Sequence, residues 1–135
     1  MAEHKVLILG GNGFIGSHLS DSLAENGYNV IALDKYTHGV RFNKSDKIKA
    51  ENADILDLDT LKKIISDVDY VVHCFSATTP FTSDSNPYLD IDGNLIPTLK
   101  ILDICTQESI KKFVFISSGG SIYGNATIDK TPTED

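Results

Sequence analysis

Short apolar runs alternate along the chain with segments in which apolar residues recur every three or four positions. Continuous β-branched or aliphatic runs indicate buried strands, and the wider spacing indicates amphipathic helices. We predict strands at 5–9, 29–33, 47–51, 68–75 and 112–118. Helices are predicted after the first, third and fourth strands, beginning near Phe14, Leu58 and Tyr88. This alternation predicts an α/β fold: a Rossmann-type, doubly wound parallel sheet with right-handed crossovers and helices on both faces.

The first and last predicted helices carry distinct signals. In the first, Ile15, Leu19 and Leu23 recur every four residues and predict one buried stripe, and Gly27 is expected to follow the end of the helix. The last contains Pro97, which lacks an N–H and crowds the preceding turn. Either this helix is kinked, or it begins near Asn94 with the proline in its first turn.

Three closely spaced glycines lie where the first strand passes into the first helix. Gly10 permits a tight turn, Gly13 has no β-carbon to hinder a phosphate, and Gly16 allows the helix to approach the sheet. The N–H groups that open the helix, together with its positive dipole end, then point at the anion. The segment predicts a pyrophosphate-binding loop, although such spacing also occurs in strand–helix turns that bind nothing.

A carboxylate ends the second predicted strand. Asp34 lies 18 positions after Gly16, close to the spacing of about 20 expected for a ribose-binding acid. A carboxylate there can accept hydrogen bonds from both adenosine ribose hydroxyls and would repel a 2′-phosphate, which favours NAD over NADP. Lys35 and Arg41 follow closely and could offset part of that repulsion. A solvated strand-end acid is the alternative interpretation.

Composition narrows the classes of partner. The net charge of −7, with Lys and Arg scattered along 135 residues, argues against a nucleic-acid surface. Cys74 and Cys105 lack metal-ligand or redox spacing, so we expect small buried apolar side chains and no metal site. His73 ends an apolar strand and is expected to be a hydrogen-bonded core imidazole. We see no signal peptide and no apolar run long enough for a membrane span, and expect a cytoplasmic protein.

Taken together, these motifs resemble the N-terminal part of extended short-chain dehydrogenases/reductases of the NAD-dependent epimerase/dehydratase group, most of all UDP-glucose 4-epimerases. The segments 10–17 and 117–124 carry most of the resemblance. It implies that residues 1–135 form the N-terminal portion of an NAD-binding Rossmann domain. It also implies a UDP-sugar substrate, with hydride removal from C4 of the sugar and return of the hydride to the other face. A homo-oligomer is one assembly state that the resemblance allows.

The resemblance assigns roles to particular residues. Those implied to bind the cofactor are Gly10, Gly13, Phe14, Ile15, Gly16, Asp34, Asp54, Ile55, Cys74, Phe75, Ser76, Asn94 and Ser117. The family's substrate-contacting Ser or Thr lies four positions before Tyr123, where this chain has Gly119. Ser118 or Ser121 could supply that hydroxyl instead, and either could equally be a polar strand-end cap.

The family's catalytic Tyr-x-x-x-Lys pair does not occur in these 135 residues. In that pair the lysine lowers the pKa of the tyrosine by placing positive charge near the phenolate. The resemblance implies that the pair lies ~25 residues beyond Tyr123 in a longer reading frame, and that the chain alone is inactive. Two alternatives stay open: a 4,6-dehydratase or NAD(P)-dependent reductase on the same scaffold, and a non-catalytic dinucleotide-binding module.

Overall fold

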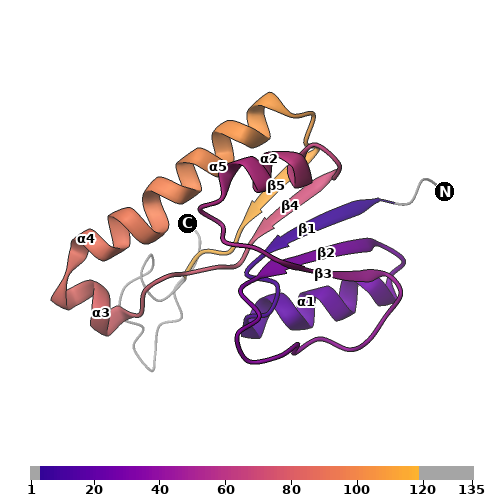
Figure 1. Ribbon diagram of the computed structural model, residues 1–135, viewed down its shortest axis with the longest axis horizontal. Helices are drawn as coiled ribbons and strands as arrows, with labels where there is room; N and C mark the ends of the chain where they lie inside the picture. Colours follow the sequence, from indigo (N-terminus) through magenta and orange to yellow (C-terminus); the bar gives the residue numbers. More distant parts are fainter. Residues whose placement is uncertain (1–3, 119–135) are drawn as a thin grey trace, which may run out of the picture.

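The computed structural model describes residues 4–118, which are built around one parallel sheet (Figure 1). Its strands are β1 (Lys5–Leu9), β2 (Asn29–Asp34), β3 (Ile48–Asn52), β4 (Tyr70–His73) and β5 (Lys112–Phe115). They lie in the order β3-β2-β1-β4-β5, and every neighbouring pair is parallel. The order reverses between β1 and β4, as in a doubly wound sheet. The predicted fold class is confirmed, although β4 and β5 are shorter than predicted.

Helices cover both faces of this sheet. They are α1 (Phe14–Glu25), α2 (Leu58–Ile65), α3 (Pro80–Ser85), α4 (Pro87–Asp90), the π-helical turn η1 (Ile91–Leu95) and α5 (Ile96–Gln107). In Figure 1, α1 lies on one side of the sheet, and α2 and α5 lie on the other. The short helix α3 was not predicted.

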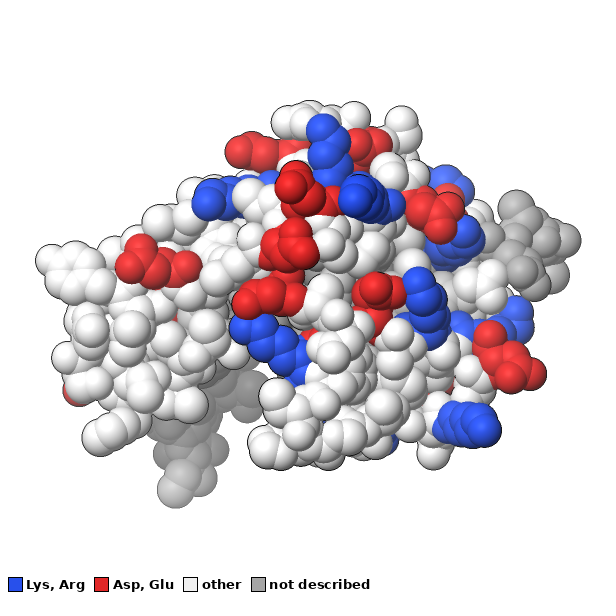
Figure 2. All heavy atoms as spheres, viewed as in Figure 1, with Lys and Arg blue, Asp and Glu red and all other residues white. Residues whose placement is uncertain are grey.

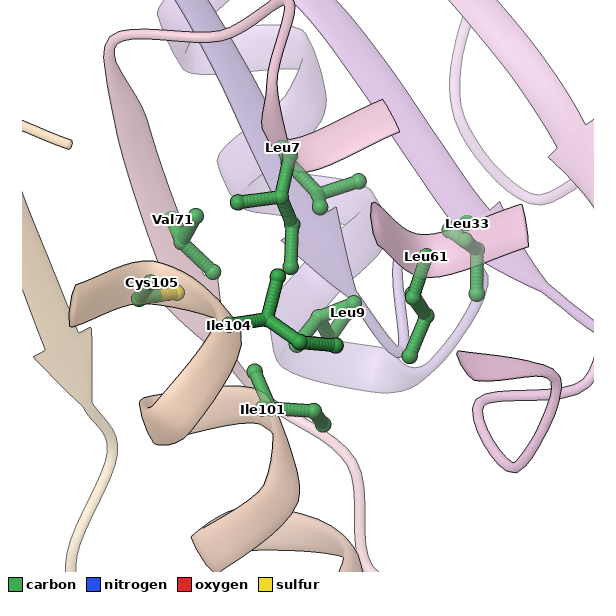
Figure 3. Close-up of a cluster of buried hydrophobic side chains, with 9 residues drawn as sticks. Leu7, Leu9, Leu33, Leu61, Val71, Ile101, Ile104 and Cys105 are labelled. Carbon is green, nitrogen blue, oxygen red and sulfur yellow. The ribbon is translucent and has the colours of Figure 1, made fainter. Parts of the chain in front are cut away.

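Alternation along β1 divides the core into two clusters. Val6 and Ile8 face α1, and Leu7 and Leu9 face α2 and α5, because successive side chains of a strand point to opposite faces. The larger cluster, on the side of α2 and α5 (Figure 3), comprises Leu7, Leu9, Leu33, Leu61, Ile65, Val71, Ile101, Ile104 and Cys105. Cys105 is therefore a buried apolar side chain, as predicted.

The buried face of α1 differs from the predicted one. Ile15 is 50% exposed, and the buried positions carry small residues: Gly16, Ser17, Ser20 and Ala24. Leu19 and Leu23 are only partly buried, at the border of the smaller core cluster. The predicted stripe is wrong at Ile15 because small residues let the helix axis lie close to the sheet, and this pushes the larger side chains to the margins.

Pro97 lies in the first turn of α5, but the helical path begins earlier, at Pro87. The turn η1 joins α4 to α5, and within it the Ile96 N–H donates to the Ile91 carbonyl, five residues back. Pro97 is fully buried just after this widened turn, where the usual hydrogen-bond ladder is already interrupted. The structure thus places the proline at the start of one helix within a longer helical segment.

Candidate functional site

The glycine-rich loop between β1 and α1 leaves almost no room for side chains. Gly10 has a φ of +80°, and a β-carbon there would lie 2.9 Å from the Phe75 backbone. A β-carbon on Gly16 would lie 2.1 Å from the Gly10 carbonyl oxygen, and one on Gly11 would lie 2.7 Å from Ala32 of β2. The close approach to the sheet predicted at Gly16 is therefore made by Gly11, while Gly16 packs against the loop itself.

The first turn of α1 presents open N–H groups next to that loop. Gly13 is the N-cap and provides no side-chain cap, and a β-carbon there would meet only the Gly10 carbonyl oxygen, at 3.2 Å. Within residues 4–118, the N–H groups of Phe14, Ile15 and Gly16 have no hydrogen-bond acceptor. Three unpaired donors at a positive helix end are suited to a phosphate group.

The carboxylate of Asp34 is held in place beside the same loop. Its Oδ2 accepts a hydrogen bond from the Asn12 N–H at 2.9 Å, and its Oδ1 accepts one from the Lys35 N–H at 2.7 Å. Burial, and next the charge of Asp34, raise the pKa of nearby Tyr36 to about 12. Each carboxylate oxygen keeps a further lone pair for a ligand hydroxyl.

Neither cation that follows Asp34 is paired with its carboxylate. Lys35 Nζ lies 2.6 Å from an Asp54 carboxylate oxygen, and this contact holds the pKa of Asp54 below its usual range. Arg41 contributes its backbone N–H, which donates to Asn12 Oδ1 at 2.8 Å, while Asn12 Nδ2 donates to the Gly39 carbonyl at 2.7 Å. Asn12, which sequence reasoning missed, thus ties the loop after β2 to the glycine-rich loop.

An open crevice of about 200 Å³ lies at the carboxyl ends of β1 to β4. Six of its lining residues were predicted to bind the cofactor: Gly10, Asp34, Asp54, Ile55, Phe75 and Ser76. The others, which were not predicted, are Lys35, Ala53, Leu56, Ala77 and Gly93. Ligands of doubly wound sheets bind at this edge, next to the point where the strand order reverses.

The remaining predicted residues lie outside the crevice lining. Cys74 is half-buried against the smaller core cluster, and burial raises the pKa of its thiol. Asn94 makes internal hydrogen bonds with both ends of its side-chain amide. Ser117 and Ser118 are exposed just beyond β5. Ser121, Gly119 and Tyr123 lie outside the described residues.

His73 is a core imidazole, as predicted. The side chain is buried, and its Nε2 lies 2.9 Å from Thr98 Oγ1. Because that hydroxyl donates its own hydrogen to the Asn94 carbonyl at 2.7 Å, the ring nitrogen is the donor of the pair. Burial lowers the pKa of His73 below its ordinary value.

The donors and acceptors at this edge fit a dinucleotide. The open N–H groups and the side-chain-free cradle suit a diphosphate, and the fixed Asp34 carboxylate suits a ribose diol. Within the described part of the chain, no group of three or more His, Cys, Asp or Glu side chains could hold a metal ion. No helix between residues 4 and 118 is long and apolar enough to cross a membrane.

Known proteins are similar to this chain in both sequence and fold. A "Putative UDP-glucose 4-epimerase" of Methanocaldococcus jannaschii is 44% identical over 120 residues, which cover 88% of this chain and 39% of that protein. "UDP-glucuronic acid decarboxylase 5" of Arabidopsis thaliana is 32% identical over 129 residues, or 95% of this chain and 37% of that protein. The solved UDP-glucose 4-epimerase of Thermus thermophilus, a complex with NAD, has a TM-score of 0.83 and 32% identity, covering 96% of this chain and 42% of that one.

The chain spans about two fifths of the length of these relatives. The model of the family described as "NAD dependent epimerase/dehydratase family" matches residues 6–135. Together with the glycine-rich loop and the strand order, this match shows that the chain belongs to the NAD dependent epimerase/dehydratase family.

Proposed function

We propose that this chain binds NAD and forms the cofactor-binding portion of a nucleotide-sugar epimerase of the UDP-glucose 4-epimerase type. The observation that carries the proposal is the Asp34 carboxylate, held by the Asn12 N–H at 2.9 Å beside the open N–H groups of α1. NAD is favoured over NADP because Lys35 is paired with Asp54, which leaves the negative charge of Asp34 uncompensated where a 2′-phosphate would lie.

In this proposal each part of the site has a separate task. The first turn of α1 binds the diphosphate, Asp34 binds the adenosine ribose, and Ile55 and Phe75 provide apolar walls for the dinucleotide. NAD bound there would supply a reversible hydride acceptor for the sugar. Ser118 or Ser121 would hydrogen-bond the reacting sugar oxygen, and the Tyr-x-x-x-Lys pair would come from residues beyond Asp135.

Calorimetric titration with NAD and NADP tests the cofactor assignment. Asp34→Ala removes hydrogen bonds to a charged group, so NAD should bind about 10- to 100-fold more weakly, and the preference over NADP should shrink. Asp59→Ala, which removes an exposed carboxylate from the first turn of α2, is the matched control and should bind as wild type. Undetectable NAD binding by folded wild-type protein, or an unchanged preference in Asp34→Ala, would contradict the proposal.

A second candidate is decarboxylation of a UDP-uronic acid, which the similarity to the Arabidopsis thaliana protein favours. The full-length protein can be incubated with UDP-glucose or with UDP-glucuronic acid, and the sugar products can then be separated. A C4 epimer from the first substrate supports the epimerase, whereas carbon dioxide and a pentose nucleotide from the second support the decarboxylase. NAD binding without turnover of either would support the non-catalytic module.

A further inference from the structure

A hydrogen-bond cluster joins the segment after β4 to the long helical segment. Asn94 Nδ2 donates to Thr78 Oγ1 at 2.7 Å and also to the Asp90 carboxylate. Thr78 Oγ1 donates to the same carboxylate oxygen at 2.6 Å, and Asn94 Oδ1 accepts from the Ala77 N–H at 2.7 Å. We name the side chains of Asp90, Asn94 and Thr78 the Asp90 clamp.

The clamp spans the π-helical turn η1. Asp90 precedes this turn and Asn94 lies within it, so that both side chains reach the segment at 76–78. Gly93 faces the same segment, since a β-carbon there would lie 2.9 Å from the Ala77 β-carbon. Hydrogen bonds from Thr78, and to a smaller extent from Asn94, hold the pKa of Asp90 below its usual range. The Asp90 carboxylate is therefore ionised at neutral pH.

What the clamp holds is a wall of the candidate site. Ser76, Ala77 and Gly93 line the crevice on the side of β4, across from Asp34. Asn94 already uses its side-chain oxygen for Ala77 and its side-chain nitrogen for Thr78 and Asp90. Direct contact of this amide with a ligand would compete with hydrogen bonds that fix the wall.

We propose that Asp90 is a positioning residue that acts on the bound dinucleotide through Asn94 and Thr78, by fixing the wall segment 76–78. This inference rests on the proposed function. Because Asp34 lies on the β2 side of the switch point, the β4 side receives the nicotinamide half of the dinucleotide. Loosening the clamp should therefore weaken binding of NAD, while binding of ADP, which lacks that half, should be retained.

Asp90→Ala, Asp90→Asn and Asp92→Ala test this arrangement by calorimetry with NAD and ADP. Asp90→Ala should weaken NAD binding about tenfold and leave ADP binding within about twofold of wild type. The reason is that it removes the charged acceptor that fixes only the β4-side wall of the crevice. Asp90→Asn should largely restore NAD binding, since its side-chain oxygen still accepts hydrogen bonds. Asp92, exposed on the same turn, is the matched control and should bind both ligands as wild type.

A double-mutant cycle separates action through the clamp from independent contact. If Asn94 acts with Asp90, Asn94→Ala and the double variant Asp90→Ala/Asn94→Ala should lose about the same NAD affinity as Asp90→Ala alone. Additive losses, equal losses for NAD and ADP, or wild-type NAD affinity in Asp90→Ala would each overturn the proposal.

Amide hydrogen exchange tests the clamp without any ligand. The Ala77 N–H, bonded to Asn94 Oδ1, should exchange several-fold faster in Asp90→Ala and at the wild-type rate in Asp92→Ala. Unchanged exchange in Asp90→Ala would overturn the clamp. Failure of wild-type protein to bind NAD, with the exchange difference present, would instead contradict the proposed cofactor.

Discussion

His73 ends β4 as a buried imidazole among aromatic rings. The ring centroids of Phe75 and Phe115 lie 4.0 and 4.8 Å from its own, and only 3% of the residue is exposed. Burial lowers its pKa because the charged ring would lose hydration. The unfolded chain therefore takes up a proton near pH 6.5 and the folded chain only at lower pH, so stability is complete above pH ~6.5 and falls as the pH decreases toward the folded pKa.

His73→Phe removes this titration. The free energy of unfolding of the wild type, measured with urea at pH 7.5 and 5.5, should decrease by about 1 kcal/mol more than that of the variant. His18→Gln, at an exposed position of α1, should keep the wild-type pH dependence. An equal pH dependence in His73→Phe and wild type would show that the imidazole does not resist protonation.

Single residues differ in how far their roles can be predicted from the sequence. Gly10 and Asp34 follow fixed distances from neighbouring motifs, and both line the crevice at the carboxyl ends of the strands. Asn12 and Asp90 could not be found in this way. Asn12 bonds to Arg41, 29 positions away, and Asp90 bonds to Thr78, 12 positions away, so both contacts depend on loop paths that periodicity does not encode.

Among the elements, α1 shows where an apolar pattern misleads. Large residues at four-residue spacing predicted the buried face, but contact with the sheet depends on which residues are small enough to let the helix approach. Ser20 fits this face because its hydroxyl donates to the Gly16 carbonyl at 2.8 Å and so carries no unpaired polar group into the core. The spacing of leucines and isoleucines alone therefore does not identify which face of α1 is buried.

Gly16→Ala and Gly27→Ala compare the reasons for a glycine within α1 and for one just after it. The first places a β-carbon 2.1 Å from the Gly10 carbonyl, a backbone clash that should cost about 3 kcal/mol or abolish folding. The second meets nothing within 4 Å but has a φ of +89°, so it should cost about 1 kcal/mol. Thermal unfolding measures both, and equal costs would contradict the close seating of α1 on its loop.

Only part of the structure of the segment from Pro80 to Gln107 can be predicted from the sequence. Thr79 before Pro80 is a helix start signal, and Thr79 and Thr82 do form a capping box at α3. The turn η1 has no such cap, and the hydrogen bonds of Asp90 and Asn94 connect it to the segment after β4. The periodicity of the leucines in α5 therefore predicted a helix but not the widened turn before Pro97.

At the scale of the whole molecule, the alternation of strands and helices was sufficient to predict the parallel sheet. The alternation does not predict which strands lie at the edges of the sheet, because it does not specify the lateral order of the strands. Figure 2 shows acidic and basic side chains interspersed over one face, with few near α3 and α4. Large apolar side chains are exposed on α3 and α4, at Phe81, Tyr88 and Leu89, and others are exposed on and just after β5.

This strand pairs only with β4 among the described residues, and Val114, Phe115 and Ile116 are 38%, 53% and 39% exposed. An unpaired strand edge with apolar side chains offers hydrogen bonds to a second chain. The 135-residue polypeptide should therefore associate increasingly with concentration in sedimentation velocity. Val114→Lys should reduce association by adding charge at this edge, and Val40→Lys, in the exposed loop after β2, should not. A monomeric wild type at high concentration would contradict an association-prone edge at β5.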